Sequence, residues 1–249
     1  MMDLGIDGKR AAVAAASKGL GYASALALAE AGVRVAICSR NRDDIEAAAA
    51  RIGPNAVPIV ADVGTVAGAT GFIEAAVETL SGVDIVVANA GGPPGGDFAA
   101  IDDIDAYARA FELNALSTIA MCRATVPAMQ AQQWGRIVAI TSIAARQPIP
   151  NLILSNTARA GLTGFLKTLA REIASDGITV NSVQPGLHAT ERITGLYGDV
   201  SGLGAGVPAG KVGDRGDFGR VVAFLCSQPA NYVTGTAIPV DGGADGGLQ

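Results

Sequence analysis

The stretch AAASKGLG, residues 14–21, begins within the last two residues of a short apolar run at Arg10–Ala15 and leads into a helical segment at Tyr22–Glu30. In a strand–turn–helix context, glycines in the turn let backbone N–H groups approach a phosphate. The positive end of the helix dipole favours the same anion. Gly19 and Gly21 supply this freedom, so the stretch predicts the first βα unit of a dinucleotide-binding fold.

The rest of the chain repeats the same alternation of short apolar runs and longer Ala/Leu-rich segments. We predict further strands at Arg34–Cys38, Ala56–Val60, Ile85–Ala88, Gly135–Thr141, Thr179–Gln184 and Ala237–Val240. We predict further helices at Asp43–Arg51, Val66–Leu80, Ile104–Gln132, Ser155–Ser175 and Asp217–Ser227. This pattern indicates one α/β domain over residues 1–249. Its architecture is a three-layer doubly wound (Rossmann) fold, with a seven-stranded, mostly parallel sheet and helices on both faces.

Composition narrows the classes of partner. The 249 residues are 49% hydrophobic and carry a net charge of −5 without a basic cluster, which argues against nucleic-acid and anionic-membrane partners. The three cysteines, Cys38, Cys122 and Cys226, show no metal-type spacing, so we predict no metal site and a reducing compartment. The first residues contain no apolar leader, and we expect a cytoplasmic protein.

The end of the second predicted strand favours a particular cofactor. An enzyme that binds NAD carries an acidic residue here for the ribose 2′-hydroxyl, whereas this chain has Ser39 and Arg40. Arg40 can bind a 2′-phosphate, and Lys18 adds a second cation from the glycine turn. The pattern predicts NADP(H) over NAD(H). The alternative is that both cations are solvated surface charges.

Four further motifs follow in order: Asp62–Val63, ANAGG at 88–92, Pro185–Gly186 with Thr190, and VTGTAIPVDGG at 233–243. Together with the glycine turn, in which Ala15 stands where a first glycine is usual, they resemble the short-chain dehydrogenase/reductase family over essentially the whole chain. The resemblance implies binding of the adenosine half near Asp62 and Asn89 and of the nicotinamide carboxamide near Thr190. The predicted cofactor-binding residues are Ala15, Ser17, Lys18, Gly19, Leu20, Gly21, Ser39, Arg40, Asp62, Val63, Asn89, Ala90, Gly91, Arg159, Pro185, Gly186 and Thr190.

The resemblance also implies a catalytic set of Asn, Ser, Tyr and Lys, the last two spaced as YxxxK on one helix. Asn114 and Ser142 match this set, but Ser155 and Arg159 stand at the Tyr and Lys positions. A serine hydroxyl donates a proton far less readily than a phenol. A guanidinium stays protonated, so Arg159 can stabilise charge and hold the nicotinamide ribose hydroxyls but cannot shuttle a proton.

Three routes for the proton therefore stay open. In the preferred hypothesis, Ser142, Ser155 and Arg159 polarise the substrate oxygen while a water held by Asn114 delivers the proton. In the second, His188, the only histidine, acts as the acid; its alternative is a packing or solvated loop residue. In the third, Tyr197 supplies a phenol from the Gly-rich segment 193–216, which we interpret as a substrate lid in place of an ordinary surface loop.

NAGGPP at 89–94 and the segment Pro148–Leu162 are similar to a β-ketoacyl-acyl-carrier-protein-reductase-like subgroup that shares the SxxxR variant. We therefore expect an NADP(H)-dependent oxidoreductase acting on a small carbonyl or 3-oxoacyl-type substrate. The alternatives are a catalytically altered NADP-binding regulatory protein and a non-redox lyase or isomerase. The family resemblance implies a homotetramer, with the long helices in contact across one two-fold axis at Ala108, Ala115, Ala160 and Gly161, and the C-terminal VDGG region in contact across another. The alternative is that these small residues only face the sheet.

Overall fold

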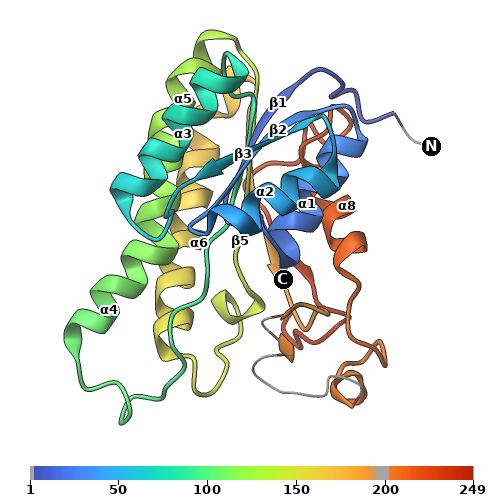
Figure 1. The fold of residues 1–249 in the computed structure, drawn as a ribbon. Helices are drawn as coiled ribbons and strands as arrows, with labels where there is room; N and C mark the ends of the chain where they lie inside the picture. The colour runs from blue at the N-terminus through green and yellow to red at the C-terminus, as the bar shows by residue number, and fades with distance from the viewer. Residues whose placement is uncertain (1–2, 192, 195–201, 249) are drawn as a thin grey trace.

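A seven-stranded sheet forms the centre of the molecule (Figure 1). The computed structural model describes residues 3–191, 193–194 and 202–248. The strand order is β3-β2-β1-β4-β5-β6-β7 and every pair is parallel. The strands are β1 (Arg10–Val13), β2 (Arg34–Ser39), β3 (Ala56–Val60), β4 (Ile85–Ala88), β5 (Gly135–Ile140), β6 (Ile178–Pro185) and β7 (Ala237–Val240). The strand order reverses between β1 and β4, which is the switch point where doubly wound folds bind ligands.

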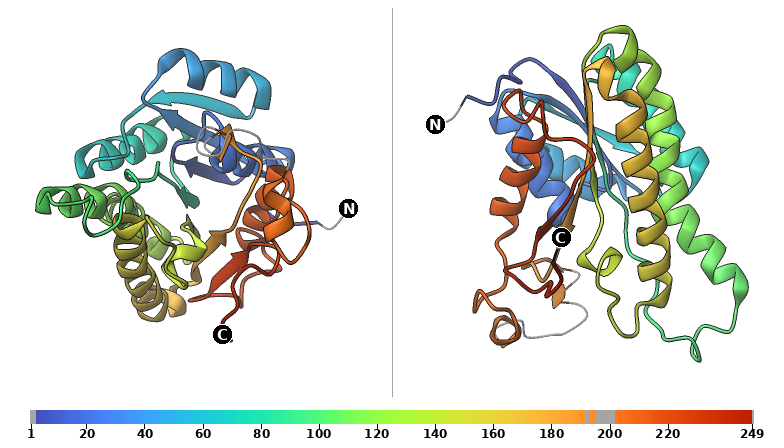
Figure 2. Two further views of the ribbon diagram at one scale, coloured as in Figure 1. Left: turned by 90° about the horizontal axis from the view of Figure 1, so that it is seen from below. Right: turned by 180° about the vertical axis from the view of Figure 1, so that it is seen from behind.

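Helices cover both faces of the sheet, so the predicted three-layer fold is confirmed (Figure 2). One face packs on α3 (Val66–Leu80), α5 (Ser117–Ala131) and α6 (Ile153–Ile173), with buried Phe72, Met121 and Leu162. The other face packs on α1 (Gly19–Glu30), α2 (Arg42–Ile52) and α8 (Arg215–Leu225). Strands with a covered face on each side need continuous apolar runs, and β4 and β5 are buried at every position.

Side-chain caps explain where three of these helices begin. Asn41, Thr65 and Asp214 each accept a hydrogen bond at 3.0 Å from the backbone N–H three residues later, at the starts of α2, α3 and α8. Helix α1 differs, because its N-cap residue Lys18 makes no side-chain cap and its first turn contains no acidic residue. The first N–H groups of α1 thus have no side-chain acceptor of this kind.

One predicted helix, Ile104–Gln132, is not uniform. The structure divides it into α4 (Ile104–Phe111), a π-helical turn (Glu112–Leu116) and α5. A π turn inserts one extra residue into the helical ladder, and such turns are frequent at functional sites. Apolar periodicity does not reveal this insertion, and Asn114 lies within it.

The Gly-rich segment is partly described and, within the described part, is attached to its surroundings. Residues 203–206 form a 3₁₀ turn, and Gly213 exchanges backbone hydrogen bonds with Leu187 and Ala189 at 2.9 and 3.0 Å. Tyr197 lies outside the described residues, so its suggested role and the lid stay predictions. None of the described helices has the length and apolar character needed to cross a membrane.

Candidate functional site

The turn after β1 has a conformation that only small residues adopt easily. Ala15 has φ of +47° and Gly19 has φ of +63°, both in the left-handed region. A Cβ on Gly21 would lie 2.6 Å from the Ala15 carbonyl oxygen and 2.7 Å from the Asn89 side-chain nitrogen. Asn89 donates from that nitrogen to the carbonyls of Ala14 and Ala15 at 3.3 and 3.1 Å. The ANAGG segment therefore holds the glycine turn, and the turn ends β1 at Val13 instead of the predicted Ala15.

The turn opens onto the first N–H groups of α1. Thr190, from the segment after β6, lies close to the glycine turn. Its Cγ2 is 3.8 Å from the position that a Cβ on Gly19 would occupy. Thr190 also lines a hollow of about 630 Å³ with Ala189, Glu191, Thr194, Asp214 and Arg215. The structure thus brings together two motifs that are about 170 residues apart in the chain. The small residues and the uncapped helix end fit the pyrophosphate of a dinucleotide.

Two cations lie in the loops between the glycine turn and the end of β2, a region that we call the corner: Lys18 is in the turn and Arg40 directly follows β2. Lys18 and Arg40 are exposed, and neither takes part in an ion pair among the described residues. Ser39 Oγ accepts the Asn41 N–H at 3.3 Å, so this hydroxyl faces the same loop. A carboxylate that would accept ribose hydroxyls is missing at Ser39 and Arg40. The corner fits a phosphate better than a ribose diol.

The structure adds a third cation that the sequence analysis missed. Arg51, in the last turn of α2, donates to the Ser17 carbonyl at 3.4 Å, and its guanidinium lies 5.0 Å from the ring centroid of Tyr22. It therefore reaches the glycine turn from a helix that carries no recognisable motif. No local pattern marks Arg51, because its role depends on how α1 and α2 pack.

At the other predicted adenosine contact, Asp62 is exposed and accepts the Gly64 N–H at 2.9 Å, while Val63 is buried. These two residues follow β3 beside the cation corner, since β3 pairs with β2 up to Ser39 and Val60. Ala90 and Gly91 continue from Asn89 at the end of β4. Parallel strands bring all these loops to one edge of the sheet.

The candidate catalytic residues meet at the same edge, at the end of β5. Arg159 donates to the Thr141 carbonyl at 2.7 Å and the Ile140 carbonyl at 3.3 Å, and its Nε donates to Ser155 Oγ at 3.2 Å. Ser155 and Arg159 are each 8% exposed, on the first turns of α6. Ser142 follows Thr141 directly, and its Oγ accepts the Ala144 N–H at 3.1 Å. This bond uses one lone pair of Ser142 Oγ and leaves the hydroxyl able to donate to another group.

Asn114 projects from the π turn, which packs on α6. Its amide nitrogen donates to the Gly91 carbonyl at 2.9 Å, which links it to the ANAGG segment. Its side-chain oxygen is buried and has no hydrogen-bond partner among the described residues. A buried acceptor without a partner indicates a water or ligand donor at this point.

His188 is packed against its own loop. It is 4% exposed, its Nδ1 lies 3.2 Å from the Gly186 carbonyl, and its ring meets Phe218 edge-on at 5.1 Å. Burial lowers the pKa of its imidazole, so the neutral form is favoured. No hydrogen bond among the described residues links it to Ser155, Arg159 or Asn114. Gly186 next to it donates to the Val240 carbonyl at 3.0 Å.

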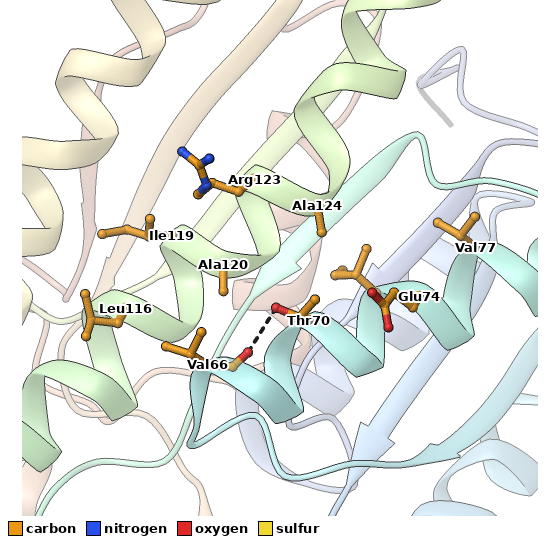
Figure 3. A pocket seen from close by; sticks show the side chains of 10 residues that line it. Val66, Thr70, Glu74, Val77, Leu116, Ile119, Ala120, Arg123 and Ala124 are labelled. Atoms are coloured by element: carbon orange, nitrogen blue, oxygen red, sulfur yellow. Dashed lines mark hydrogen bonds between the residues drawn. The ribbon is translucent and has the colours of Figure 1, made fainter.

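Other features of the described residues lie apart from this edge. A groove of about 650 Å³ runs between α3 and α5 and contains none of the predicted site residues (Figure 3). Burial raises the pKa of the Cys38, Cys122 and Cys226 thiols to about 12. The described part of the chain contains no cluster of three acidic, cysteine or histidine side chains arranged to hold a metal ion.

Comparison with known proteins identifies the family of the chain. The fold and the glycine turn define a dinucleotide-binding α/β protein. Residues 14–245 match the family model described as Enoyl-(Acyl carrier protein) reductase. The chain is 34% identical to the 3-oxoacyl-[acyl-carrier-protein] reductase FabG of Escherichia coli, over 96% of this chain and 98% of FabG. It is 32% identical to Dehydrogenase/reductase SDR family member 4 of Bos taurus, over 96% of this chain and 88% of that protein. The chain therefore belongs to the short-chain dehydrogenase/reductase family and is an oxidoreductase of that family.

Solved structures are similar over almost the whole chain. L-sorbose reductase from Gluconobacter frateurii, crystallised with NADPH and L-sorbose, aligns with a TM-score of 0.92 at 30% identity, covering 99% of this chain and 100% of that one. YwfH, an NADPH-dependent reductase involved in bacilysin biosynthesis, aligns with a TM-score of 0.92 at 25% identity, covering 97% and 100%. The predicted fold is thus confirmed by structures as well as by sequence.

Proposed function

We propose that the protein is an NADP(H)-dependent reductase of a small carbonyl or 3-oxoacyl-type substrate. The observation that carries this proposal is the corner between the glycine turn and the end of β2, where Lys18 and Arg40 are exposed and neither is in a described ion pair. A 2′-phosphate placed there gains charge-assisted hydrogen bonds that a free 2′-hydroxyl cannot make. The NADPH named for L-sorbose reductase and YwfH supports the same cofactor.

The reaction needs a group that stabilises negative charge on the substrate oxygen while NADPH supplies the hydride. Ser142 Oγ accepts the Ala144 N–H and can donate its own proton, and Ser155 Oγ accepts from the buried Arg159 Nε at 3.2 Å. Arg159 keeps its charge at any pH used for an assay, so it stabilises the developing alkoxide without giving up a proton. In this role Ser142 and Ser155 hold the oxygen, and Arg159 acts on it through Ser155.

The proton is proposed to come from a water held by the unpartnered oxygen of Asn114. That water gives its proton to the alkoxide and recovers one from the solvent, so the charge balances without a side-chain acid. His188 is the less favoured donor, because its burial favours the neutral ring and its Nδ1 faces the Gly186 carbonyl. Tyr197 and a lid over residues 193–216 stay predictions.

Titration calorimetry with NADPH and NADH, followed by an absorbance assay on a panel of ketones, aldehydes and 3-oxoacyl thioesters, tests the proposal. We expect NADPH to bind at least about tenfold more tightly than NADH, the value of one charge-assisted hydrogen bond. We also expect NADPH oxidation with some member of the panel. Equal binding of the two dinucleotides would contradict the assignment of the cofactor.

A second function is favoured by one observation, the replacement of the phenol and ammonium expected at Ser155 and Arg159. A regulatory protein that binds NADPH without turning it over needs neither group. Tight NADPH binding with no oxidation across the panel, and activity created by Ser155→Tyr with Arg159→Lys, would favour this function. Product formation without nicotinamide consumption would favour a lyase or isomerase.

A further inference from the structure

The segment that follows β7 contacts three loops of the candidate site. We call Asp241–Gly247 the clasp; it begins where β7 ends at the edge of the sheet, next to the end of the chain marked C (Figure 2). Asp241 organises the clasp internally, since its carboxylate accepts the Gly243 N–H at 2.9 Å and the Asp245 N–H at 2.7 Å. The clasp is therefore a built turn with its own acceptors.

The first contact is with the loop that carries Ser142. Arg146 donates to the Asp245 carboxylate at 3.3 Å and to the Ala237 carbonyl at 3.2 Å, and the side-chain oxygen of Gln147 accepts the Gly246 N–H at 3.3 Å. The Asp245 side chain is only 5% exposed and that of Arg146 is 25% exposed. An ion pair this buried is screened far less than a surface pair.

Arg146 and Gln147 are connected directly to the turn of Ser142. Their backbone N–H groups both donate to the Ile143 carbonyl at 2.9 Å. Within the same turn, Ala145 N donates to the Ser142 carbonyl at 3.1 Å, and Ala144 N donates to Ser142 Oγ at 3.1 Å. A shift of Arg146 therefore changes the turn that orients the Ser142 hydroxyl.

The other two contacts involve the first residues of the clasp, Asp241 and Gly242. Gly242 accepts the Ala209 N–H at 3.0 Å, and a Cβ on Gly242 would lie 2.8 Å from Val207 Cγ1. Asp241 lies close to Gly186, since a Cβ added to Gly186 would be only 2.8 Å from the Asp241 Cα. The clasp thus joins the Ser142 turn to the described end of the Gly-rich segment and to the Pro185–Gly186 turn.

We infer that Asp245 is a positioning residue for the proposed reduction: through Arg146 it holds the turn that aims the Ser142 hydroxyl at the substrate oxygen. The inference rests on the proposed function, because Ser142 has this task only there. Asp245 touches no reacting atom in this role. Its effect should therefore depend on the presence of the Ser142 hydroxyl.

The test is a double-mutant cycle of Asp245→Asn with Ser142→Ala. We expect Asp245→Asn to lower kcat by about tenfold and to leave NADPH affinity unchanged. In the Ser142→Ala background the same substitution should lower kcat by less than about twofold, because two residues that act through one interaction have non-additive effects. Asp245→Glu should restore part of the activity. The matched control is Asp217→Asn, which removes an exposed carboxylate paired with Arg220 at 3.3 Å. Equal losses with and without the Ser142 hydroxyl would overturn the inference.

A second readout does not depend on turnover. Amide hydrogen exchange of residues 144–147 should be about tenfold faster in Asp245→Asn than in the unchanged protein, with α6 unaffected, because local opening of the turn is eased. If the protein turns over no substrate, this measurement still tests the clasp while the proposed function fails. Unchanged exchange at residues 144–147 would show that Asp245 does not hold the turn.

Discussion

At the scale of single residues, Arg159 is the group on which the proposed SxxxR site depends. Its guanidinium binds two carbonyls at the end of β5 and the hydroxyl of Ser155, so its planar fork is held in one orientation. A lysine at this position would offer a point charge and an exchangeable proton. Under the proposed function, Arg159 held in this way stabilises charge and the proton comes from another group.

Arg40 carries the residue-scale prediction for cofactor choice. Arg40→Ala should weaken NADPH binding by about tenfold and leave NADH binding unchanged, because it removes one charge-assisted contact to the 2′-phosphate. Calorimetry at two salt concentrations measures both affinities. Arg42→Ala is the matched control, since Arg42 is exposed nearby and paired with Glu46 at 3.3 Å. An equal loss for both dinucleotides would contradict the predicted contact.

Ala15 carries a prediction for stability. Its φ of +47° is unfavourable for a residue with a Cβ, by about 1–2 kcal/mol. Ala15→Gly should relieve this strain and, after the added entropy of the unfolded chain, raise the free energy of unfolding by about 0.5–1 kcal/mol. Urea denaturation measures the change. Ala16→Gly, at a buried neighbour without positive φ, should be destabilising.

At the scale of elements, the π turn and the segment after β6 determine which candidate residues can act. The π turn presents Asn114 so that its amide binds Gly91 and its oxygen stays without a described partner. The segment after β6 brings Thr190 to Gly19 but packs His188 against Phe218. Thr190 and His188 are two positions apart, but Thr190 lies at the glycine turn and His188 is packed against Phe218.

The buried imidazole predicts how stability depends on pH. Burial lowers the folded-state pKa of His188 below its ordinary value near 6.5, so the unfolded chain binds the proton first as the pH falls. The free energy of unfolding should therefore decrease below about pH 6.5, by up to about 1.4 kcal/mol per pH unit. His188→Asn, which keeps a donor near Nδ1, should remove this slope between pH 7.5 and 5.5. An unchanged slope in chemical denaturation would show that other groups cause it.

At the scale of the whole molecule, the homotetramer stays a proposal that the exposed faces of the helices support in part. Ala108, Ala160 and Gly161 are exposed, as a helix-to-helix contact between subunits requires. The prediction of Ala115 as an interface residue is wrong, because its side chain is 4% exposed and belongs to the hydrophobic core. Close approach of helices depends on such small exposed residues.

The proposed interface predicts that Ala160→Leu, at an exposed position of α6, changes the assembly. We expect light scattering of the unchanged protein to give a tetramer at micromolar concentration, and of Ala160→Leu a smaller species, since a large side chain would separate the helices. Thr168→Leu, an exposed change further along α6, serves as a comparison for added hydrophobicity alone. A monomer in the unchanged protein would contradict the proposal.

Local patterns were sufficient to predict the fold, and they named most of the candidate residues, whose roles stay predictions. Apolar runs with the periods of strands and helices predicted the seven strands and the covered sheet, because buried parallel strands require such runs. The glycine turn, Ser39–Arg40 and the SxxxR spacing could be read directly, since each depends on residues close in the chain.

Long-range packing decided what local patterns could not show. Arg51 reaches the glycine turn only because α1 and α2 pack together, and the clasp reaches Arg146 across 99 residues of chain. The π turn at Asn114 and the burial of His188 likewise depend on neighbours distant in sequence. Hydrogen-bond partners and burial are properties of the assembled chain, so a sequence names the groups while the tertiary structure sets what each group can do.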